Sequence, residues 1–322
     1  DRYASLRINM GESGAFAEVD AKIWGLDSAI DRGLKVPQNG DIIEVSSHKA
    51  DEYQGRTQWV LRQFRILSTS EKEAAITNFT APSDIGLTQY QGQLEALINR
   101  VPDDRLCGRV LCSIFDRSDF REAFYQAPAA YVHHQNYPGG LLEHTVNVTT
   151  LALSIADNYP AGKTRGLTYN GNNLPIDHAL LICAGLLHDI GKLETYDLSP
   201  LPEVTDANRW QGHLSISYAR VHQACEPFLK NSPTKDDQDE VQKLLHCILS
   251  HHGILEYGSP VLPVCAEAFI LSQADMIDAR LADIQDAAGQ IMVQDPNARW
   301  VPRHHHFPQG IFIGDWKNLG QP

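Results

Sequence analysis

Long apolar runs are missing from this chain of 322 residues, because no segment approaches the roughly 18 consecutive apolar residues of a membrane helix. Its opening residues, DRYASLRINMGESG, also lack the basic-then-apolar pattern of a secretory signal. We therefore expect a cytoplasmic protein without a membrane partner.

Cysteine is scarce, and its six occurrences are scattered along the chain with no C-x-x-C pair. Such spacing is typical neither of a disulfide framework nor of a structural zinc site. Most of these thiols lie inside apolar segments, where cysteine behaves as a small hydrophobic side chain. We expect reduced, structural residues at Cys107, Cys112, Cys183, Cys225, Cys247 and Cys265.

Positive charge is also in short supply, since 27 lysines and arginines face 40 aspartates and glutamates and leave a net charge of −13. The imbalance is uneven: residues 1–68 hold 9 basic against 10 acidic residues, whereas residues 69–322 hold 18 against 30. Bulk charge therefore does not indicate nucleic-acid binding. It does not exclude such binding, because bound divalent cations can supply the positive charge that a phosphate needs.

Alternating apolar and polar residues dominate residues 1–68. In EVDAKIW, Val19, Ala21 and Ile23 alternate with charged residues, which is typical of a half-buried strand. EYQGRTQWVLRQFRIL indicates a hairpin that turns near Gln54–Gly55. Several such strands predict a small OB-like β-barrel, a fold that binds single strands by stacking bases on aromatic rings. The candidates for stacking, with filling of the barrel as the alternative, are Trp24, Tyr53, Trp59 and Phe64.

From residue 69 onward the apolar periodicity becomes helical. We expect a helix capped by Ser83 or Asp84 whose apolar face includes Leu87, Leu94, Leu97 and Ile98. Clusters of Gly, Pro and Asn separate the later helical segments. Length and composition fit a two-domain protein, so the predicted fold class is multidomain α and β, with strands first and helices after.

Histidine and aspartate interrupt the apolar faces of these expected helices. His144 shares a helical face with Leu141 in GGLLEHTVNV, and one such histidine alone is more often structural than a ligand. His188 and Asp189 end the apolar segment IDHALLICAGLLHDIG, which we expect to stop at Gly191 as a glycine C-cap. Neighbouring residues point about 100° apart on a helix, so both reach one centre only where several helices converge.

Other expected helices carry further side chains of the ligand type, namely His213 in WQGHLSISYA, His251 and His252 in LLHCILSHHGI, and Asp275 in ILSQADMIDARLADI. A mixture of imidazoles and carboxylates suits magnesium or first-row divalent metals better than structural zinc, and the set is too large for one tetrahedral centre. We predict two divalent cations that share Asp189. Their ligands are His144, His188, Asp189, His213, His251 and Asp275, with His252 either an alternative ligand or a neighbour of the ligands.

The order of His144, the His188–Asp189 pair and Asp275 resembles the H…HD…D signature of the HD superfamily of metal-dependent phosphohydrolases. The blocks HHQNYPGGLLEHTVNV, LLHDIGK, GHL and ILSHHGILEYGSPVLPVCAEA are similar, more narrowly, to those of the YhaM-type 3′→5′ exoribonucleases. This resemblance covers nearly the whole chain. It implies an OB-like nucleic-acid-binding domain, a helical connector, an all-α HD domain and a C-terminal tail, at residues 1–68, 69–125, 126–290 and 291–322.

The resemblance also implies a reaction and its participants. The expected activity trims single-stranded RNA, with single-stranded DNA as a second substrate, and uses Mn²⁺ or else Mg²⁺, Fe²⁺, Co²⁺ or Ni²⁺. Two cations about 3.5–4 Å apart can activate a bridging water and stabilise the leaving alkoxide, so no protein nucleophile is needed. The implied catalytic residues are Asp189, Lys192 and His134. The implied substrate-binding residues are His133, His134, Lys192, His252, Trp24 and Trp59.

Several alternatives stay open. Lys192 could cap its helix in solvent, and His133 and His134 could form an ordinary polar loop. The protein could act on nucleotides or cyclic nucleotides, or it could process DNA in conjugation, because HHQNYPGGLLEHT is similar to a block of certain relaxases. A non-catalytic RNA-binding protein is least favoured, since every ligand is present. The segment 272–274 (SQA) departs from the aliphatic-histidine pair usual in the exoribonuclease family, which leaves substrate preference open, and homo-oligomer formation is open as well.

Overall fold

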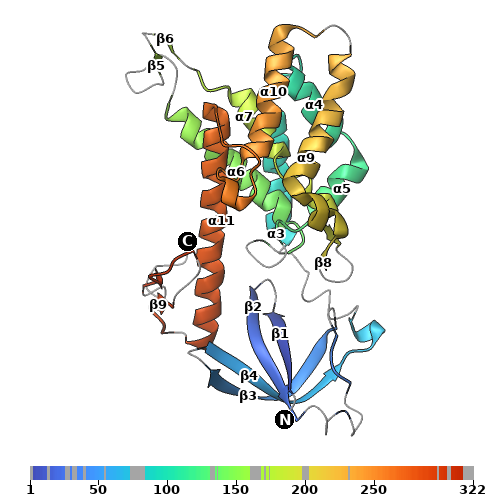
Figure 1. Cartoon of the computed structure of the whole chain (residues 1–322), viewed down its shortest axis with the longest axis vertical. Helices are drawn as coiled ribbons and strands as arrows, with labels where there is room; N and C mark the ends of the chain where they lie inside the picture. The colour runs from blue at the N-terminus through green and yellow to red at the C-terminus, as the bar shows by residue number, and fades with distance from the viewer. Residues whose placement is uncertain are drawn as a thin grey trace. The chain divides into compact units, whose positions relative to one another are not determined.

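The chain divides into two compact units, one formed by Asp1–Ser83 together with Ile284–Pro322 and the other by Asp84–Asp283 (Figure 1). The computed structural model describes residues 3–12, 15–25, 30, 35–38, 41–53, 56–72, 84–130, 135, 137–159, 168–169, 172–173, 175–197, 203–230, 233–295, 297–302 and 306–314. The domain boundaries implied by the resemblance stay predictions.

A four-stranded sheet forms the N-terminal part of the first unit, with strands in the order β1-β2-β4-β3. Strands β1 and β2 pair antiparallel, as do β3 and β4, whereas β2 and β4 pair parallel. The predicted alternation is confirmed for the end of β2, since Ala21 and Ile23 are buried with Leu61 while Trp24 is exposed; the side chain of Val19 lies outside the described ones. The strands are β1 (Tyr3–Glu12), β2 (Ala15–Trp24), β3 (Ile43–Tyr53) and β4 (Arg56–Ile66).

The structure confirms the predicted hairpin, but its described residues do not show the predicted barrel. Tyr53 pairs with Arg56 across the β3–β4 turn, which confirms the hairpin, although Gln54–Gly55 themselves lie outside the described residues. An OB barrel has five strands. Within the described part of the chain, β1 and β3 are the two edges of an open sheet and no further strand joins them. The structure therefore shows a small sheet, without closure into a barrel.

The C-terminal part of the first unit has its own small core. It contains the end of helix α11 (Ala266–Gln294) and the paired strands β9 (Trp300–Val301) and β10 (Ile311–Phe312). The buried side chains of this core are Ala287, Ala288, Val301, Ile311 and Ile313.

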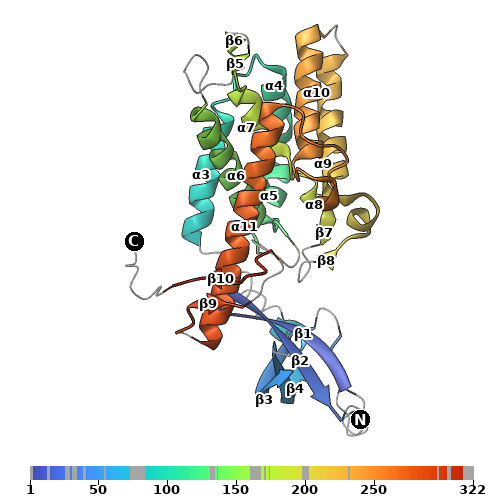
Figure 2. The same ribbon diagram turned by 60° about the vertical axis from the view of Figure 1, so that its left-hand side comes forward.

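The second unit is predominantly helical, as expected, and its helices surround one continuous apolar core (Figures 1 and 2). Both views show α9 and α10 side by side. The helices are α3 (Asp84–Ile98), α4 (Leu106–Phe115), α5 (Ser118–Gln126), α6 (Gly140–Asp157), α7 (His178–Leu187), α8 (Lys192–Thr195), α9 (Asp206–Leu229), α10 (Lys235–Ser250) and the first part of α11. Shorter elements are η1 (Leu255–Tyr257) and the ladders β5 (Thr168–Tyr169) with β6 (Asn172–Asn173) and β7 (Tyr196–Asp197) with β8 (Glu203–Val204).

Helix α7 lies at the centre of this unit, which fits its apolar sequence. Every residue from Leu180 to Leu187 is buried, as expected of a helix that is hydrophobic on all sides. Asp177 caps its N-terminus by accepting a hydrogen bond of 3.0 Å from the Leu180 N–H. Arg105 binds that Asp177 carboxylate and also Glu240, so the starts of α4 and α7 are joined to α10. The polar residues that follow α7, His188 and Asp189, therefore lie in the core of the unit.

Two glycines that follow helices behave differently. Gly253 has φ +79° and follows α10 in the left-handed conformation of a C-terminal glycine. The prediction for Gly191 is wrong, because its φ is −64° and α7 ends at Leu187. A Cβ at Gly191 would collide with the carbonyl oxygen of His213, so this glycine permits close packing against α9.

Among the described helices, none combines the length and the apolar character that crossing a lipid bilayer would require.

Candidate metal centre

Five helices or helix ends converge on one group of polar side chains in the core of the helical unit. Helix α6 carries His144, the residues after α7 are His188 and Asp189, α9 carries His213, the residues after α10 are His251 and His252, and α11 carries Asp275. All are buried or half-buried, and His188 and His251 have no exposed surface. The structure therefore brings together every residue that the sequence predicted as a metal ligand.

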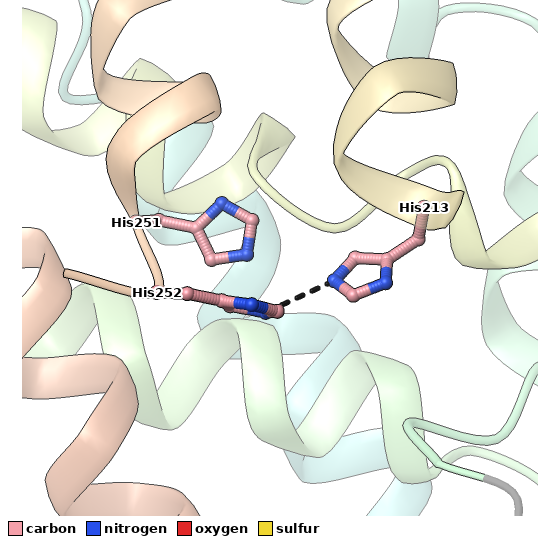
Figure 3. A group of neighbouring side chains, drawn as sticks. All are labelled: His213, His251 and His252. Atoms are coloured by element: carbon pink, nitrogen blue, oxygen red, sulfur yellow. Dashed lines mark hydrogen bonds between the residues drawn. The ribbon is translucent and has the colours of Figure 1, made fainter. Parts of the chain in front are cut away.

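Six of these side chains form two clusters of three. Within each cluster, the candidate ligand atoms lie within 4.8 Å of one another. One cluster contains His144, His188 and Asp189, and the other contains His213, His251 and His252. Figure 3 shows the second cluster, in which the Nε2 atoms of His213 and His252 approach to 3.1 Å. Two imidazole nitrogens that face each other this closely need a proton or a cation between them.

Asp189 belongs to the first cluster but also faces the second. Each of its two carboxylate oxygens is directed toward the histidines of one cluster. Its Oδ2 atom is 3.4 Å from His144 Nε2 and 3.3 Å from His188 Nε2. Its Oδ1 atom is 3.4 Å from His213 Nε2 and 3.5 Å from His251 Nε2. One carboxylate can thus serve both clusters, which is the arrangement that two cations sharing a ligand require.

Asp275 joins only the first cluster, where its Oδ1 atom lies 3.2 Å from His144 Nε2. The segment before it, 272–274, continues α11 into the apolar core. Ser272 is buried and donates its hydroxyl to the Phe269 carbonyl, and Ala274 is fully buried. Two of the residues that depart from the usual exoribonuclease pattern, Ser272 and Ala274, therefore pack α11 against the core next to Asp275.

Backbone carbonyls fix which nitrogen of three histidines faces the centre. His188 Nδ1–H donates to Gly185 O at 2.7 Å, and His251 Nδ1–H donates to Ile248 O at 2.6 Å. These carbonyls lie at the C-terminal ends of α7 and α10, where helices leave carbonyls without partners. His252 Nδ1–H donates in the same way to the Tyr257 carbonyl at the end of η1, at 2.6 Å. A carbonyl can only accept, so Nε2 of each ring presents a lone pair to the centre.

Two buried atoms in this centre have no hydrogen-bond partner among the described residues: Asp189 Oδ1 and His251 Nε2. Both are acceptors, and leaving a buried acceptor unsatisfied costs about 1–3 kcal/mol, or more if it is charged. A divalent cation satisfies such lone pairs without a proton. The donor set of imidazoles and carboxylates therefore fits divalent metal ions.

The pKa shifts favour neutral rings at His213 and His252 and an ionised carboxylate at Asp189. Burial holds the pKa of His213 well below its ordinary value, and burial together with His251 lowers the pKa of His252. Burial alone would raise the pKa of Asp189, but Lys192 and His188 outweigh it and hold the pKa well below the usual range. Neutral imidazole and ionised carboxylate are the protonation states that bind metals.

His144 differs in the direction of its pKa shift. Burial would lower the pKa of His144, but Asp189, Asp275 and Asp278 outweigh burial and raise it well above the ordinary value. A cation at this ring must therefore displace a proton.

Lys192 lies beside this carboxylate, with Nζ 2.6 Å from Asp189 Oδ2. Its side chain is 10% exposed, so the alternative of a solvated helix cap is wrong. Burial would lower the pKa of Lys192, but the Asp189 carboxylate outweighs burial and raises it. Lys192 is therefore a charged group within the centre.

Sequence reasoning missed Asp278, whose Oδ2 atom accepts a hydrogen bond of 2.7 Å from His144 Nδ1–H. Carboxylates in this position commonly orient metal-binding histidines. The signal was present, because Asp275 and Asp278 are three residues apart in QADMIDAR and so share a helical face.

The predicted substrate-binding residues are distributed over both units. His133 and His134 lie outside the described residues. Trp24 ends β2 with 48% of its surface exposed, and the Lys22 ammonium group lies 5.7 Å from the centre of its ring. Trp59 is half-buried, packs against the core of the sheet and stacks on His48 at 3.7 Å. Trp24 is therefore the more exposed of the two rings.

Comparisons with known proteins identify relatives. Residues 141–280 match the HD domain family. The 3′-5′ exoribonuclease YhaM of Listeria innocua serovar 6a is 30% identical over 268 residues, which cover 82% of this chain and 75% of the relative. Proteins of the same name from Bacillus subtilis (strain 168) and Shouchella clausii (strain KSM-K16) are 29% and 26% identical. Their alignments cover 82% and 90% of this chain and 75% and 85% of the relatives. No solved structure matched the chain.

The HD match contains every ligand-type residue of the centre, from His144 to Asp275. The alignment with the Listeria protein extends well beyond that match, over 82% of the chain. The chain therefore belongs to the family of HD-domain proteins that includes the YhaM 3′-5′ exoribonucleases.

Proposed function

We propose that this protein is a metal-dependent 3′→5′ exoribonuclease that hydrolyses phosphodiester bonds of single-stranded RNA, and of single-stranded DNA as a second substrate. The observation that carries the proposal is the placement of Asp189, whose two oxygens face two separate histidine clusters. The named activity of the relatives supports the choice of polymer and direction.

In this proposal the two clusters hold two divalent cations, with Mn²⁺ as the first choice and Mg²⁺, Fe²⁺, Co²⁺ or Ni²⁺ as alternatives. His144, His188 and Asp275 hold one cation, His213 and His251 hold the other, and Asp189 is shared. His252 completes the second cluster as a further ligand. When bound, such a pair lowers the pKa of water, neutralises phosphate oxygens and stabilises the leaving alkoxide.

The residues of the chain prepare this chemistry before substrate arrives. The carbonyls of Gly185 and Ile248 keep the rings of His188 and His251 in the tautomer that presents Nε2. Lys192 neutralises the buried Asp189 carboxylate. When Asp189 binds the cations, the Lys192 ammonium group would bind a phosphate oxygen of the substrate. His133 and His134 are proposed to contact the scissile phosphate or a base.

Residues 1–68 are proposed to act as an OB-like module that captures the strand. Its sheet combines antiparallel and parallel pairing, and Trp24 offers an exposed ring on which a base can stack. The module would raise affinity for polymer while the helical unit cleaves.

The test is incubation of the full chain, loaded with Mn²⁺, with single-stranded RNA and DNA labelled at the 5′ end. We expect a ladder of shortening labelled fragments that a blocked 3′ terminus abolishes. Internal cuts in 3′-blocked strands would contradict the direction. Intact strands together with hydrolysis of mononucleotides or cyclic nucleotides would favour a nucleotide phosphohydrolase instead.

A further inference from the structure

Gln135 has an unusual backbone conformation for its residue type. It precedes α6, and its φ of +55° makes it the one non-glycine residue with positive φ in the described part of the chain. L-residues with long side chains rarely adopt this left-handed conformation, and such outliers cluster at functional sites. The surrounding structure must therefore hold Gln135 in place.

Two backbone contacts do so. The Gln135 carbonyl oxygen accepts a hydrogen bond of 2.9 Å from the Ala129 N–H. Gly140, the first residue of α6, packs against the same carbonyl so closely that a Cβ there would collide with it. The left-handed conformation is thus imposed by the close approach of the chain to the start of the helix that carries His144.

The side chain of Gln135 points into the protein, with 8% of the residue exposed. Its Nε2 atom donates to Asp278 Oδ2 at 3.4 Å, and its Oε1 atom is buried without a hydrogen-bond partner among the described residues. The amide orientation follows from this network, because an ionised carboxylate only accepts. Gln135 therefore combines a strained backbone with a buried oxygen that no described residue satisfies, and neither feature favours folding.

Among the described residues, the hydrogen bond that the Gln135 side chain makes leads to the metal centre. Asp278 Oδ2, which receives the Gln135 amide, also receives His144 Nδ1–H at 2.7 Å. In the neutral, metal-binding form of the ring, that bond leaves Nε2 as the acceptor atom, and Nε2 faces Asp189 and Asp275. A chain of two hydrogen bonds therefore connects a strained residue to a ligand of the first cluster.

We propose that Gln135 is a positioning residue for the metal centre: its strained backbone holds an amide against Asp278, and Asp278 fixes the tautomer and orientation of His144. The inference rests on the proposed function, because it requires that His144 bind a cation. It has a distinctive consequence. Replacing Gln135 should weaken the first metal site while leaving the fold as stable as before, or more so.

Two substitutions separate the backbone from the amide. Gln135→Gly removes the strain, the unpaired oxygen and the amide together. Gln135→Asn keeps an amide and tolerates the left-handed conformation, but its side chain is one methylene shorter and does not reach Asp278. Asp278→Asn tests the second link, because a neutral amide holds His144 Nδ1–H less firmly than a carboxylate does. Gln223→Ala, at an exposed position of α9, is the matched control.

The experiment measures Mn²⁺ binding to the full chain by calorimetric titration, thermal unfolding of the metal-free protein, and the ¹⁵N shifts of the His144 ring. We expect Asp278→Asn to lose about 10–100-fold in affinity at one of the two sites. Both Gln135 variants should lose affinity at that same site by a smaller factor, of about tenfold or less. Their midpoint of thermal unfolding should be unchanged or higher, and the His144 shifts should indicate mixed tautomers.

Unchanged affinity and shifts in both Gln135 variants, beside two tight sites in the parent protein, would overturn the inference and leave the proposed function intact. A lower unfolding midpoint in both variants would also overturn it, because Gln135 would then be a structural residue. If the parent protein binds no Mn²⁺ and none of the alternative cations, the proposed function itself fails.

Discussion

The helical unit and the sheet unit treat charge in opposite ways. The helical unit buries Asp189 and the histidines His144, His188 and His251 beside an apolar core that includes the leucines of α7. The sheet has a thin apolar core, and Arg65 pairs with Glu44 and Glu71 at its exposed surface. Buried ionisable groups oppose folding unless something satisfies them, whereas exposed ion pairs matter little. The buried ionisable groups therefore identify the helical unit as the part of the protein whose free energy of unfolding is lowered by the residues of its candidate site.

The largest effect should follow from Asp189→Ala, because the two oxygens of this one carboxylate face the histidines of both clusters. We expect elemental analysis of the Mn²⁺-loaded protein to find less than one cation per chain, and the rate of strand shortening to fall by more than about a hundredfold. The control is Asp119→Ala, which removes an exposed carboxylate and should change neither quantity. Retained metal and activity in Asp189→Ala would contradict the shared-ligand arrangement.

Chelation should destabilise the helical unit selectively. A ligand at a hundred times its dissociation constant stabilises the folded state by about 2.7 kcal/mol, so chelation should lower the unfolding midpoint by roughly 5–10 °C. Hydrogen exchange read by mass spectrometry should show lost protection in α7 and α10 and unchanged protection in β2 and β4. Equal loss of protection in both units would mean that the contrast between them is not caused by metal binding.

The two tryptophans of the sheet should separate capture from packing. Trp24→Ala should weaken single-stranded RNA binding by about 1–3 kcal/mol if a base stacks on its ring, which is 48% exposed. Trp59→Ala should mainly lower the free energy of unfolding, since its ring packs on the sheet core and on His48. Fluorescence anisotropy without added cations measures the first effect and denaturant titration the second. A larger binding loss in Trp59→Ala would reverse the assignment.

The smallest effect concerns ion pairs outside the centre. Arg105 outweighs the burial that would raise the pKa of Asp177, so that pKa is lowered in the folded protein. A lowered carboxyl pKa stabilises the fold above the unfolded value, and this contribution is lost as pH falls through the folded value. Arg105→Ala should therefore cost up to about 1 kcal/mol at pH 7, since the pair is partly screened by solvent. The deficit should shrink below about pH 4.

The exposed Arg65 provides the comparison for that measurement. Arg65→Ala should leave the unfolding free energy unchanged both at pH 7 and below about pH 4, because solvent screens its two ion pairs. A pH-independent deficit in Arg105→Ala would indicate lost packing of the arginine stem instead of a lost charge.

The sequence was most informative where its signals are local. Alternation in residues 19–23 and the turn residues near position 54 predicted strands and a hairpin, and the apolar run before His188 predicted a buried helix. Closure of the sheet could not be read in this way, because it depends on pairing between strands far apart in the chain. Gly191 was misread for a similar reason. Its local pattern is that of a C-cap, but its neighbour across the packed interface is α9.

By itself, the sequence determined the ligand types, their order along the chain and their attachment to apolar helices, because each is a property of a short segment. Only the tertiary structure decided that Asp189 directs one oxygen to each cluster and that Lys192 is buried beside it. It alone revealed that Asp278 and Gln135 stand behind His144. The physical reason is that helix periodicity specifies which face a side chain occupies, whereas distances between side chains on different helices are specified by how the whole core packs.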